Sequence, residues 1–294
     1  MRHLLTTRPH PSRPAARGTG GTGGSRRVHD LVAQSYRAEE GIIGSKTAAA
    51  LDTLEPHWHH WPQPARVVDL GIGDGDLLAS LMARCPVPVE PAGVDISPEM
   101  LRRATARLPG LTAIEGSAAD ASRLLPAGEF TAVFAHFILA YVPLTAVLRE
   151  AAALLRSGGV LSLATSTNEM ARPLQAQLAE LGRHRSIRSR LVRAAARRGL
   201  ARSNTPESFE HMLPAFAEAG FTVVERRTLT FPVVFRSARE AYTFMVEDGW
   251  GVNALIHPLV PPSVMARLAP WGLKAFRYPY EATHHVEVLL LRRD

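Results

Sequence analysis

The sequence predicts an α/β protein built around a doubly wound, mostly parallel β-sheet. Between residues 65 and 166, five short apolar runs alternate with amphipathic, helix-like segments. Buried parallel strands have this character because helices cover both faces of their sheet. The chain has 294 residues, of which 46% are hydrophobic. This is enough for one large domain of this kind with additions.

The five strands follow one another at regular intervals. They are expected at residues 65–70 (ARVVDL), 91–96 (PAGVDI), 111–116 (LTAIEG), 130–139 (FTAVFAHFIL) and 160–166 (VLSLATS). Helices are expected between them at 76–84, from Pro98 onward and at 144–156. Ser97 is a typical N-cap, with Pro98 in the first helical position. Gly158 and Gly159 predict a glycine C-cap for the helix before the fifth strand.

After Asn168 the regular alternation stops. Helices are expected at 169–202, after Thr205, at 237–248 and, with proline breaks, at 252–276, and strands at 222–235 and 283–293. The last strands are expected to complete the sheet, so no domain boundary is placed after Asn168. The expected organisation is a disordered basic arm at 1–27, an N-terminal helical lid at 28–64 and a main domain at 65–294, with helical insertions at 169–205 and 249–280.

Composition narrows the class of protein. Residues 1–27 contain six arginines and no acidic residue, so they carry most of the formal net charge of +7. The rest of the chain is close to neutral, which argues against a nucleic-acid-binding core. There is no apolar run of about 18 residues and no apolar core of a secretory signal near the start. Cys85 is the single cysteine, which fits a reducing compartment. We therefore expect a cytoplasmic protein without a membrane span.

The turn after the first strand carries an unusual combination of residues. Residues 67–78, VVDLGIGDGDLL, contain Gly71, Gly73 and Gly75 together with three aspartates. A pyrophosphate-binding loop has the spacing G-x-G-x-x-G, whereas here the third glycine comes one residue early. Carboxylates beside it would repel a phosphate and attract a cation. S-adenosylmethionine fits this pattern, since it has an ammonium and a sulfonium but no phosphate.

This stretch resembles motif I of the class I S-adenosylmethionine-dependent methyltransferases, usually D-x-G-x-G-x-G. The resemblance is to the small-molecule, ubiquinone/menaquinone-methyltransferase-like type and continues in order from about residue 65 to 165. It implies a Rossmann-like seven-stranded sheet whose last strand is antiparallel, plus a helical cap. The segment THHVEVLLL, residues 283–291, is the candidate for that strand. S-adenosyl-L-methionine is the implied cofactor, bound at the carboxyl ends of the strands.

The resemblance also implies the residues of the cofactor site. Asp95 matches the acid that holds the ribose hydroxyls. Where the family often has Gly-Asp-Ala near the adenine, this chain has Gly-Ser-Ala, so either Ser117 or Asp120 is expected to contact the base. The complete implied set is Asp69, Gly71, Ile72, Gly73, Gly75, Asp95, Ile96, Met100, Ser117, Ala118 and His136.

His136 is also the candidate catalytic residue. It stands after the fourth strand, beside the expected position of the transferred methyl, where a general base could deprotonate a hydroxyl, a phenol or an acidic carbon. Lining the pocket or a structural hydrogen bond are the alternatives. The Asn/Asp-Pro-Pro-Tyr/Phe motif is absent from this position, which argues against N-methylation of a base or amide. Tyr141 could touch the acceptor or belong to the core.

Two further clusters have weaker functional interpretations. His57, His59 and His60 lie close together, but no matching ligand cluster accompanies them. No metal is therefore predicted, and an aromatic helix end packed on the sheet edge is expected. An arginine run free of acids could be a solvated helix face, or could bind a carboxylate or phosphate substrate, an acidic carrier protein or RNA. Without interleaved aromatic residues, RNA is disfavoured. The run comprises Arg183, Arg185, Arg188, Arg190, Arg193, Arg197, Arg198 and Arg202.

Together, these features predict a methyltransferase that acts on oxygen or carbon of a small acceptor. The segments expected to cover the pocket carry Trp58, Trp61, Phe244, Trp250 and Trp271, which favour a hydrophobic or aromatic acceptor. The alternatives are an NAD(P)-dependent Rossmann oxidoreductase and a non-catalytic or RNA-binding methyltransferase-like protein. The sequence leaves open the acceptor, the methylated atom and the oligomeric state.

Overall fold

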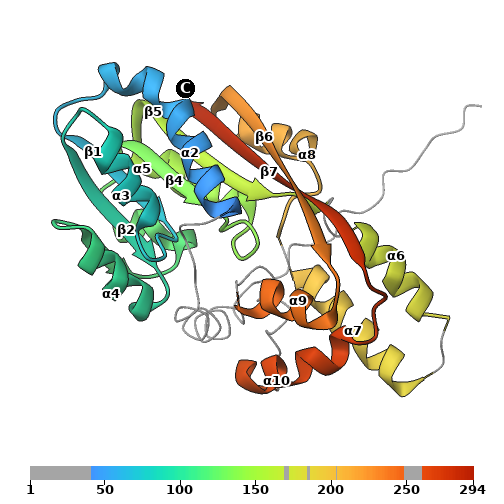
Figure 1. Ribbon diagram of the computed structural model, residues 1–294. Coiled ribbons are helices and arrows are strands. Elements are labelled where there is room, and N and C mark those ends of the chain that lie inside the picture. Colours follow the sequence, from blue (N-terminus) through green and yellow to red (C-terminus); the bar gives the residue numbers. More distant parts are fainter. Residues whose placement is uncertain (1–40, 169–171, 184–185, 203, 248–259) are drawn as a thin grey trace, which may run out of the picture.

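The computed structural model describes residues 41–168, 172–183, 186–202, 204–247 and 260–294. Its centre is a seven-stranded sheet in the order β3-β2-β1-β4-β5-β7-β6 (Figure 1). The strands are β1 (Ala65–Leu70), β2 (Val89–Asp95), β3 (Thr112–Glu115), β4 (Phe130–His136), β5 (Leu155–Ser166), β6 (Phe221–Phe235) and β7 (Tyr280–Arg293). The predicted arm at 1–27 and the lid up to residue 40 lie outside the described residues.

The direction of the strands confirms the predicted fold. The pairs β1–β2, β1–β4, β2–β3 and β4–β5 are parallel. The last strand, β7, is antiparallel to both of its neighbours, β5 and β6. The chain winds outward in opposite directions from β1 and from β4. These two strands therefore flank a topological switch point, where open α/β sheets bind ligands at the carboxyl ends.

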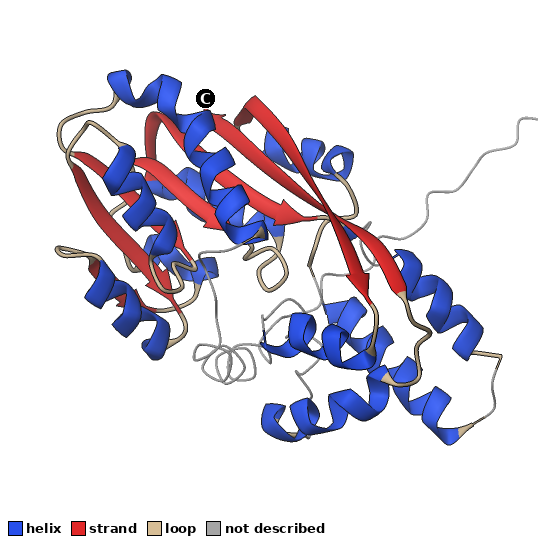
Figure 2. Ribbon diagram, in the orientation of Figure 1, coloured by secondary structure: helices blue, strands red, loops and turns tan. Residues whose placement is uncertain are grey.

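Helices cover both faces of the sheet (Figure 2). On one face lie α2 (Ile42–Leu54), η1 (Glu55–His60), α3 (Asp76–Arg84) and α4 (Pro98–Arg107). On the other lie η2 (Ala118–Arg123), α5 (Leu144–Leu154) and α8 (Phe209–Glu218). Within β4, Ala132 and Phe134 pack on the first face, whereas Val133 and Ala135 pack on the second. A strand buried on both sides has this alternation, which explains its continuous apolar sequence.

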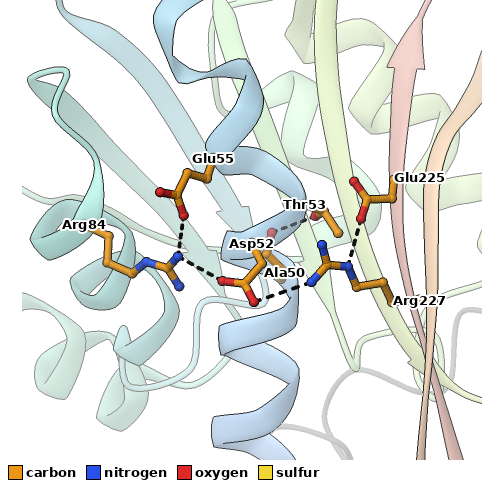
Figure 3. A network of polar contacts seen from close by, with 7 residues as sticks. All are labelled: Ala50, Asp52, Thr53, Glu55, Arg84, Glu225 and Arg227. Atoms are coloured by element: carbon orange, nitrogen blue, oxygen red, sulfur yellow. Dashed lines mark hydrogen bonds and ion pairs between the residues drawn. The ribbon is translucent and has the colours of Figure 1, made fainter.

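The helix α2 lies across the sheet rather than beside it. Ala49 and Ala50 pack against Val286 and Val288 of β7, while Leu51 contributes to the core around α3. At its carboxyl end, Asp52 accepts hydrogen bonds from Arg84 of α3 (2.9 Å) and from Arg227 of β6 (3.4 Å) (Figure 3). Exposed ion pairs of this kind add little stability, but they fix the helix between two other elements.

The aromatic residues after α2 lie in the core instead of over a pocket. Trp58 and Trp61 are buried with Leu54 and Ala65, so their proposed role in covering the acceptor site is wrong. The reason is topological: η1 leads into the start of β1, and the ligand edge of a parallel sheet is at the opposite, carboxyl end. The expectation that this aromatic helix end packs on the sheet is confirmed, but it packs beside the central strands β1 and β4 rather than on an edge strand.

The helix before β5 is shorter than predicted. It ends at Leu154, because Leu155 is extended (φ −68°, ψ 138°) and pairs with Phe130 of β4. Gly158 has a positive φ of 70°, but it turns the chain inside an irregular part of β5. The glycine C-cap predicted for this helix is therefore wrong.

The last two strands extend well beyond the rest of the sheet. The pairing of β5 with β7 ends at Ser166 and Val286, while β6 and β7 remain paired as far as Phe235 and Tyr280. The six residues 280–285 thus project about 20 Å past the carboxyl edge, at ~3.3 Å per residue. The cap helices gather at this end (Figure 1). They are α6 (Arg172–Leu181), α7 (Ile187–Arg202), α9 (Ala238–Tyr242), η4 (Thr243–Glu247) and α10 (Pro262–Leu273).

Candidate functional site

The candidate site lies where β1 and β4 end, and its floor is the glycine turn. Gly71, Gly73 and Gly75 all have positive φ, at 83°, 57° and 83°. An L-residue with a Cβ atom rarely adopts this conformation, whereas glycine does so without steric cost. The turn therefore depends on glycine at these three positions.

The three glycines have different surroundings. A Cβ atom at Gly71 would lie 2.4 Å from the side chain of Ile138, and one at Gly75 would lie 3.2 Å from the backbone of Ala104 in α4. One at Gly73 would meet no described atom within 4 Å. Gly71 and Gly75 thus allow close packing within the protein, and Gly73 is the glycine whose missing side chain leaves open space. The Ile72 side chain is buried and faces Gly93 of β2, so only its backbone remains for a ligand.

Asp95 at the end of β2 shapes the same turn. Its Oδ2 accepts a hydrogen bond from the Gly73 N–H at 2.9 Å, and its Oδ1 accepts one from the Ser97 N–H at 2.9 Å. A carboxylate offers about four lone-pair sites, so these bonds leave acceptor capacity for the two ribose hydroxyls. The geometry therefore fits the role that the resemblance implies for Asp95.

The other residues implied around the nucleoside lie on the loops after β2 and β3. Ile96 is half-buried, and Met100 is buried with its N–H donating to the Ser97 Oγ at 3.3 Å. Ser117 caps η2 by accepting from the Ala119 N–H at 3.2 Å, and Ala118 is buried beside it. Asp120 is exposed and forms an ion pair with Arg123 at 3.3 Å. Of the two candidates for the adenine contact, Ser117 is the more sheltered.

The three aspartates of the turn were expected to attract a cationic ligand together, but the structure gives them different surroundings. Asp74 and Asp76 form ion pairs with Arg107 of α4, at 3.0 and 2.9 Å. Their charge is therefore largely neutralised by a residue 31 positions or more away. Asp69 is different, because it is buried and its Oδ1 has no hydrogen-bond partner within the described part of the chain. Burial raises the pKa of Asp69 to about 7, against the opposing effect of Lys46.

His136 ends β4 and is enclosed by protein. Its Nε2 lies 2.9 Å from the Ser162 Oγ, and its Nδ1 lies 3.3 Å from the Lys46 Nζ. Burial, and to a lesser degree the charge of Lys46, lower its pKa well below the usual value. The ring is therefore neutral near pH 7, with a protein partner at each nitrogen.

Lys46 lies beside His136, although it was not among the site residues expected from the sequence. It is the fifth residue of α2 and is 4% exposed. Its Nζ also lies 5.6 Å from the centroid of the Phe137 ring. Phe137 has a positive φ of 57°, an uncommon conformation that clusters at functional sites. Nothing in the local sequence around Lys46 signals this position, since long-range packing alone brings α2 to β4.

The cap is linked to the loop after β4. Tyr141 packs on Ala266 of α10 together with Tyr242 and Met245, and the Asn204 N–H donates to the Ala140 carbonyl at 3.3 Å. Tyr141 is thus part of a small apolar cluster between sheet and cap. Phe244 lies against Phe235, with ring centroids 5.1 Å apart. Trp250 lies outside the described residues.

The arginine run is divided between structural and exposed positions. The Arg188 guanidinium lies 5.2 Å from the Trp271 ring and donates to the Trp271 carbonyl at 2.8 Å, which joins α7 to α10. Arg193 lies half-buried beside Gly182. The arginines at 183, 190, 197 and 198 are exposed. The side chains of Arg185 and Arg202 are not described.

Two other features bear on function. Within the described ranges, no group of three or more His, Cys, Asp or Glu side chains is arranged to hold a metal ion. His57, His59 and His60 lie on η1 instead, with the rings of the last two 3.7 Å apart. Among the helices that the structure describes, none combines the length and apolarity that crossing a bilayer requires.

Comparison with known proteins agrees with this geometry. Residues 67–159 match the family described as "Methyltransferase domain". A trans-aconitate 2-methyltransferase of Rhodopseudomonas palustris (strain BisA53) is 30% identical over 260 residues, which are 86% of this chain and 93% of the relative. A ubiquinone biosynthesis O-methyltransferase of Xanthomonas axonopodis pv. citri is 37% identical over 115 residues, 35% of this chain and 44% of that relative. The cyclopropane synthase MmaA2 of Mycobacterium tuberculosis shares the fold, with a TM-score of 0.56 at 14% identity, covering 92% of this chain and 98% of that one.

Proposed function

Because this chain belongs to the family of class I S-adenosylmethionine-dependent methyltransferases that includes the trans-aconitate 2-methyltransferases, we propose that it methylates a carboxylate oxygen of a small organic acid. The chain is an S-adenosylmethionine-dependent enzyme with a Rossmann-like fold. The atom and the acceptor are the proposed part. Both follow from the names of two relatives that match most of the chain, which are trans-aconitate 2-methyltransferases.

The observation that carries this proposal is the environment of His136. Its two ring nitrogens lie 2.9 and 3.3 Å from Ser162 and Lys46, and burial disfavours its protonated form. In this arrangement it is poorly placed to remove a proton from an acceptor. A carboxylic acid has an ordinary pKa near ~4 and is already ionised at neutral pH, so no general base is needed. A phenol or alcohol would need one.

The residues of the site then have binding and orienting roles. The bound cofactor supplies an electrophilic methyl group on a sulfonium. Asp95 and the backbone of the glycine turn would hold the nucleoside, and Asp69 would attract the positively charged end. His136, fixed between Ser162 and Lys46, would keep the end of β4 in position. The protein's contribution is to align the acceptor oxygen with the methyl group and to exclude water.

The cap supports an anionic acceptor without specifying it. The cap helix α7 carries exposed arginines, and guanidinium groups bind carboxylates with two parallel hydrogen bonds. The hydrophobic or aromatic acceptor expected from the sequence stays a prediction, as does an acidic carrier protein. Cys85 is a free thiol, which supports the proposed cytoplasmic location.

A transfer assay with labelled S-adenosylmethionine tests the proposal. The acceptors should include di- and tricarboxylic acids, trans-aconitate among them, and matched phenols and catechols. We expect transfer to an acid, and a product that mild alkali hydrolyses, because methyl esters are base-labile and aryl methyl ethers are not. An alkali-stable product, or transfer to phenols alone, would refute carboxylate methylation and restore the case for His136 as a base.

A further inference from the structure

Lys46 occupies a position that the roles assigned so far do not explain. It is one of two lysines in the chain, and its ammonium is buried at the carboxyl ends of β1 and β4. Its Nζ lies 3.3 Å from the His136 Nδ1 and 5.6 Å from the centre of the Phe137 ring. An ammonium has three N–H donors, and the histidine accepts from one. A neutral ring and an aromatic face are modest compensation for an ammonium removed from water.

The balance of forces on Lys46 shows this cost. Burial lowers its pKa to about 8, although Asp69, Asp76 and Asp74 act in the opposite direction. Asp74 and Asp76 are already paired with Arg107. Buried charges are normally paired. The weak compensation that the protein itself gives this ammonium therefore points to a ligand that completes its surroundings.

A second, independent observation points to a ligand at the same place. The Asp69 Oδ1 is buried and has no hydrogen-bond partner among the residues that the structure describes, although a buried carboxylate oxygen normally accepts at least one bond. Lys46 and Asp69 are close enough to interact electrostatically, and the described residues leave hydrogen-bonding capacity on both at the switch point. This arrangement is complementary to a zwitterion, with a carboxylate at the lysine and an ammonium at the aspartate.

We propose that Lys46 is a carboxylate-binding residue of the active site and that it recognises the amino-acid end of the cofactor together with Asp69. The acceptor's carboxylate is the other source of the same chemistry. That second source rests on the proposed function, whereas the first does not.

The fold holds Lys46 firmly enough for this role. Ala49 and Ala50, three and four residues further along α2, lie on the same face of the helix and pack against β7. The Asp52 contacts with Arg84 and Arg227 tie the other end of α2 to α3 and β6 (Figure 3). The lysine side chain is therefore delivered to the end of β4 by a helix anchored along its length.

Two ligands that differ in the amino-acid end separate the possibilities. S-adenosylhomocysteine carries the carboxylate and ammonium, and 5′-methylthioadenosine lacks both. Calorimetry on the full chain should compare the parent with Lys46→Met, which removes the charge but keeps the length. In Lys46→Met we expect S-adenosylhomocysteine to bind roughly 10- to 100-fold more weakly, the loss of one charge-assisted contact. The affinity for 5′-methylthioadenosine should stay within about twofold.

Lys274→Met is the matched control, since Lys274 is the other lysine and is exposed after α10. It should leave both affinities unchanged. The readout is the ratio of the two affinities, which does not change if part of the sample is unfolded. If Lys46→Met does not fold, Lys46→Gln serves in its place, and Lys46→Arg should restore part of the ratio.

The other outcomes are equally informative. An unchanged ratio with a raised acceptor KM and an unchanged kcat would assign Lys46 to the acceptor's carboxylate. An unchanged ratio and an unchanged KM would overturn the proposal, as would equal weakening of both ligands with a lowered thermal midpoint, the signature of a purely structural residue. The calorimetric comparison needs no acceptor, so it stands even if carboxylate methylation is refuted.

Discussion

Replacing Asp95 tests whether one carboxylate both shapes the glycine turn and holds the cofactor. In Asp95→Ala, the N–H groups of Gly73 and Ser97 lose acceptors at 2.9 Å, and Ser97 is fully buried. A hydrogen bond to a charged group contributes about 1.5–3 kcal/mol. Since the Gly73 side is open to water, we expect the free energy of unfolding to fall by about 2–4 kcal/mol in total.

Cofactor affinity should fall separately. Loss of the ribose contact should weaken S-adenosylhomocysteine roughly 10- to 100-fold, from the same energy per charged hydrogen bond. Asp95→Asn keeps one carbonyl oxygen as an acceptor. Its loss of stability should therefore be about half of that in Asp95→Ala, and its loss of cofactor affinity should also be smaller.

Urea denaturation gives the first quantity and calorimetry the second. Glu90→Gln is a suitable control, because Glu90 is exposed at the opposite end of the same strand and should change stability by less than ~0.5 kcal/mol. Parent-like stability in Asp95→Ala would refute the role in shaping the turn. Parent-like affinity would remove Asp95 from the cofactor site.

Four further predictions follow from the same geometry. Gly71→Ala should lower the thermal midpoint, because its Cβ would lie 2.4 Å from a buried isoleucine; Gly73→Ala should leave the midpoint less affected and lower cofactor affinity, as calorimetry would show. The Asp69 pKa rises from 3.8 to about 7 on folding, so between these values the folded state binds one proton more than the unfolded state. The stability of the unliganded parent should therefore fall as the pH rises from 4 to 7. The thermal midpoint of Asp69→Asn should therefore increase relative to that of the parent as the pH rises through that window. A difference that stays constant with pH would contradict the pKa shift. If the acceptor is a carboxylate, His136→Gln should keep kcat/KM within about tenfold of the parent's and with the same pH dependence from pH ~6 to 9, whereas a loss of roughly 10²–10⁴-fold that shrinks at high pH would identify a base. Deleting residues 1–27 should leave folding and cofactor affinity intact, because that segment has little apolar surface to bury; unfolding of the truncated chain would contradict the predicted disorder.

Local chemistry explains why much of this protein is legible in its sequence. Gly71, Gly73 and Gly75 predict a turn with positive φ angles, and Ser97 followed by Pro98 predicts the start of α4. The apolar run of β4 reports burial on both faces. Asp95 could be picked as a site residue because motif spacing and strand end coincide, and the structure adds its bonds to Gly73 and Ser97.

What only the tertiary structure decided depends on contacts between distant segments. Because β7 lies between β5 and β6, the β6–β7 pair can extend past the rest of the sheet, toward the cap helices. Arg107 neutralises Asp74 and Asp76 from another helix. Lys46 reaches His136 across 90 residues. A sequence shows which side chains carry charge, but the energy of a charge depends on burial and on its partners. Those are properties of the folded chain, and here they separate Asp69 and Lys46, which are buried at the ligand edge, from neighbours that are already paired.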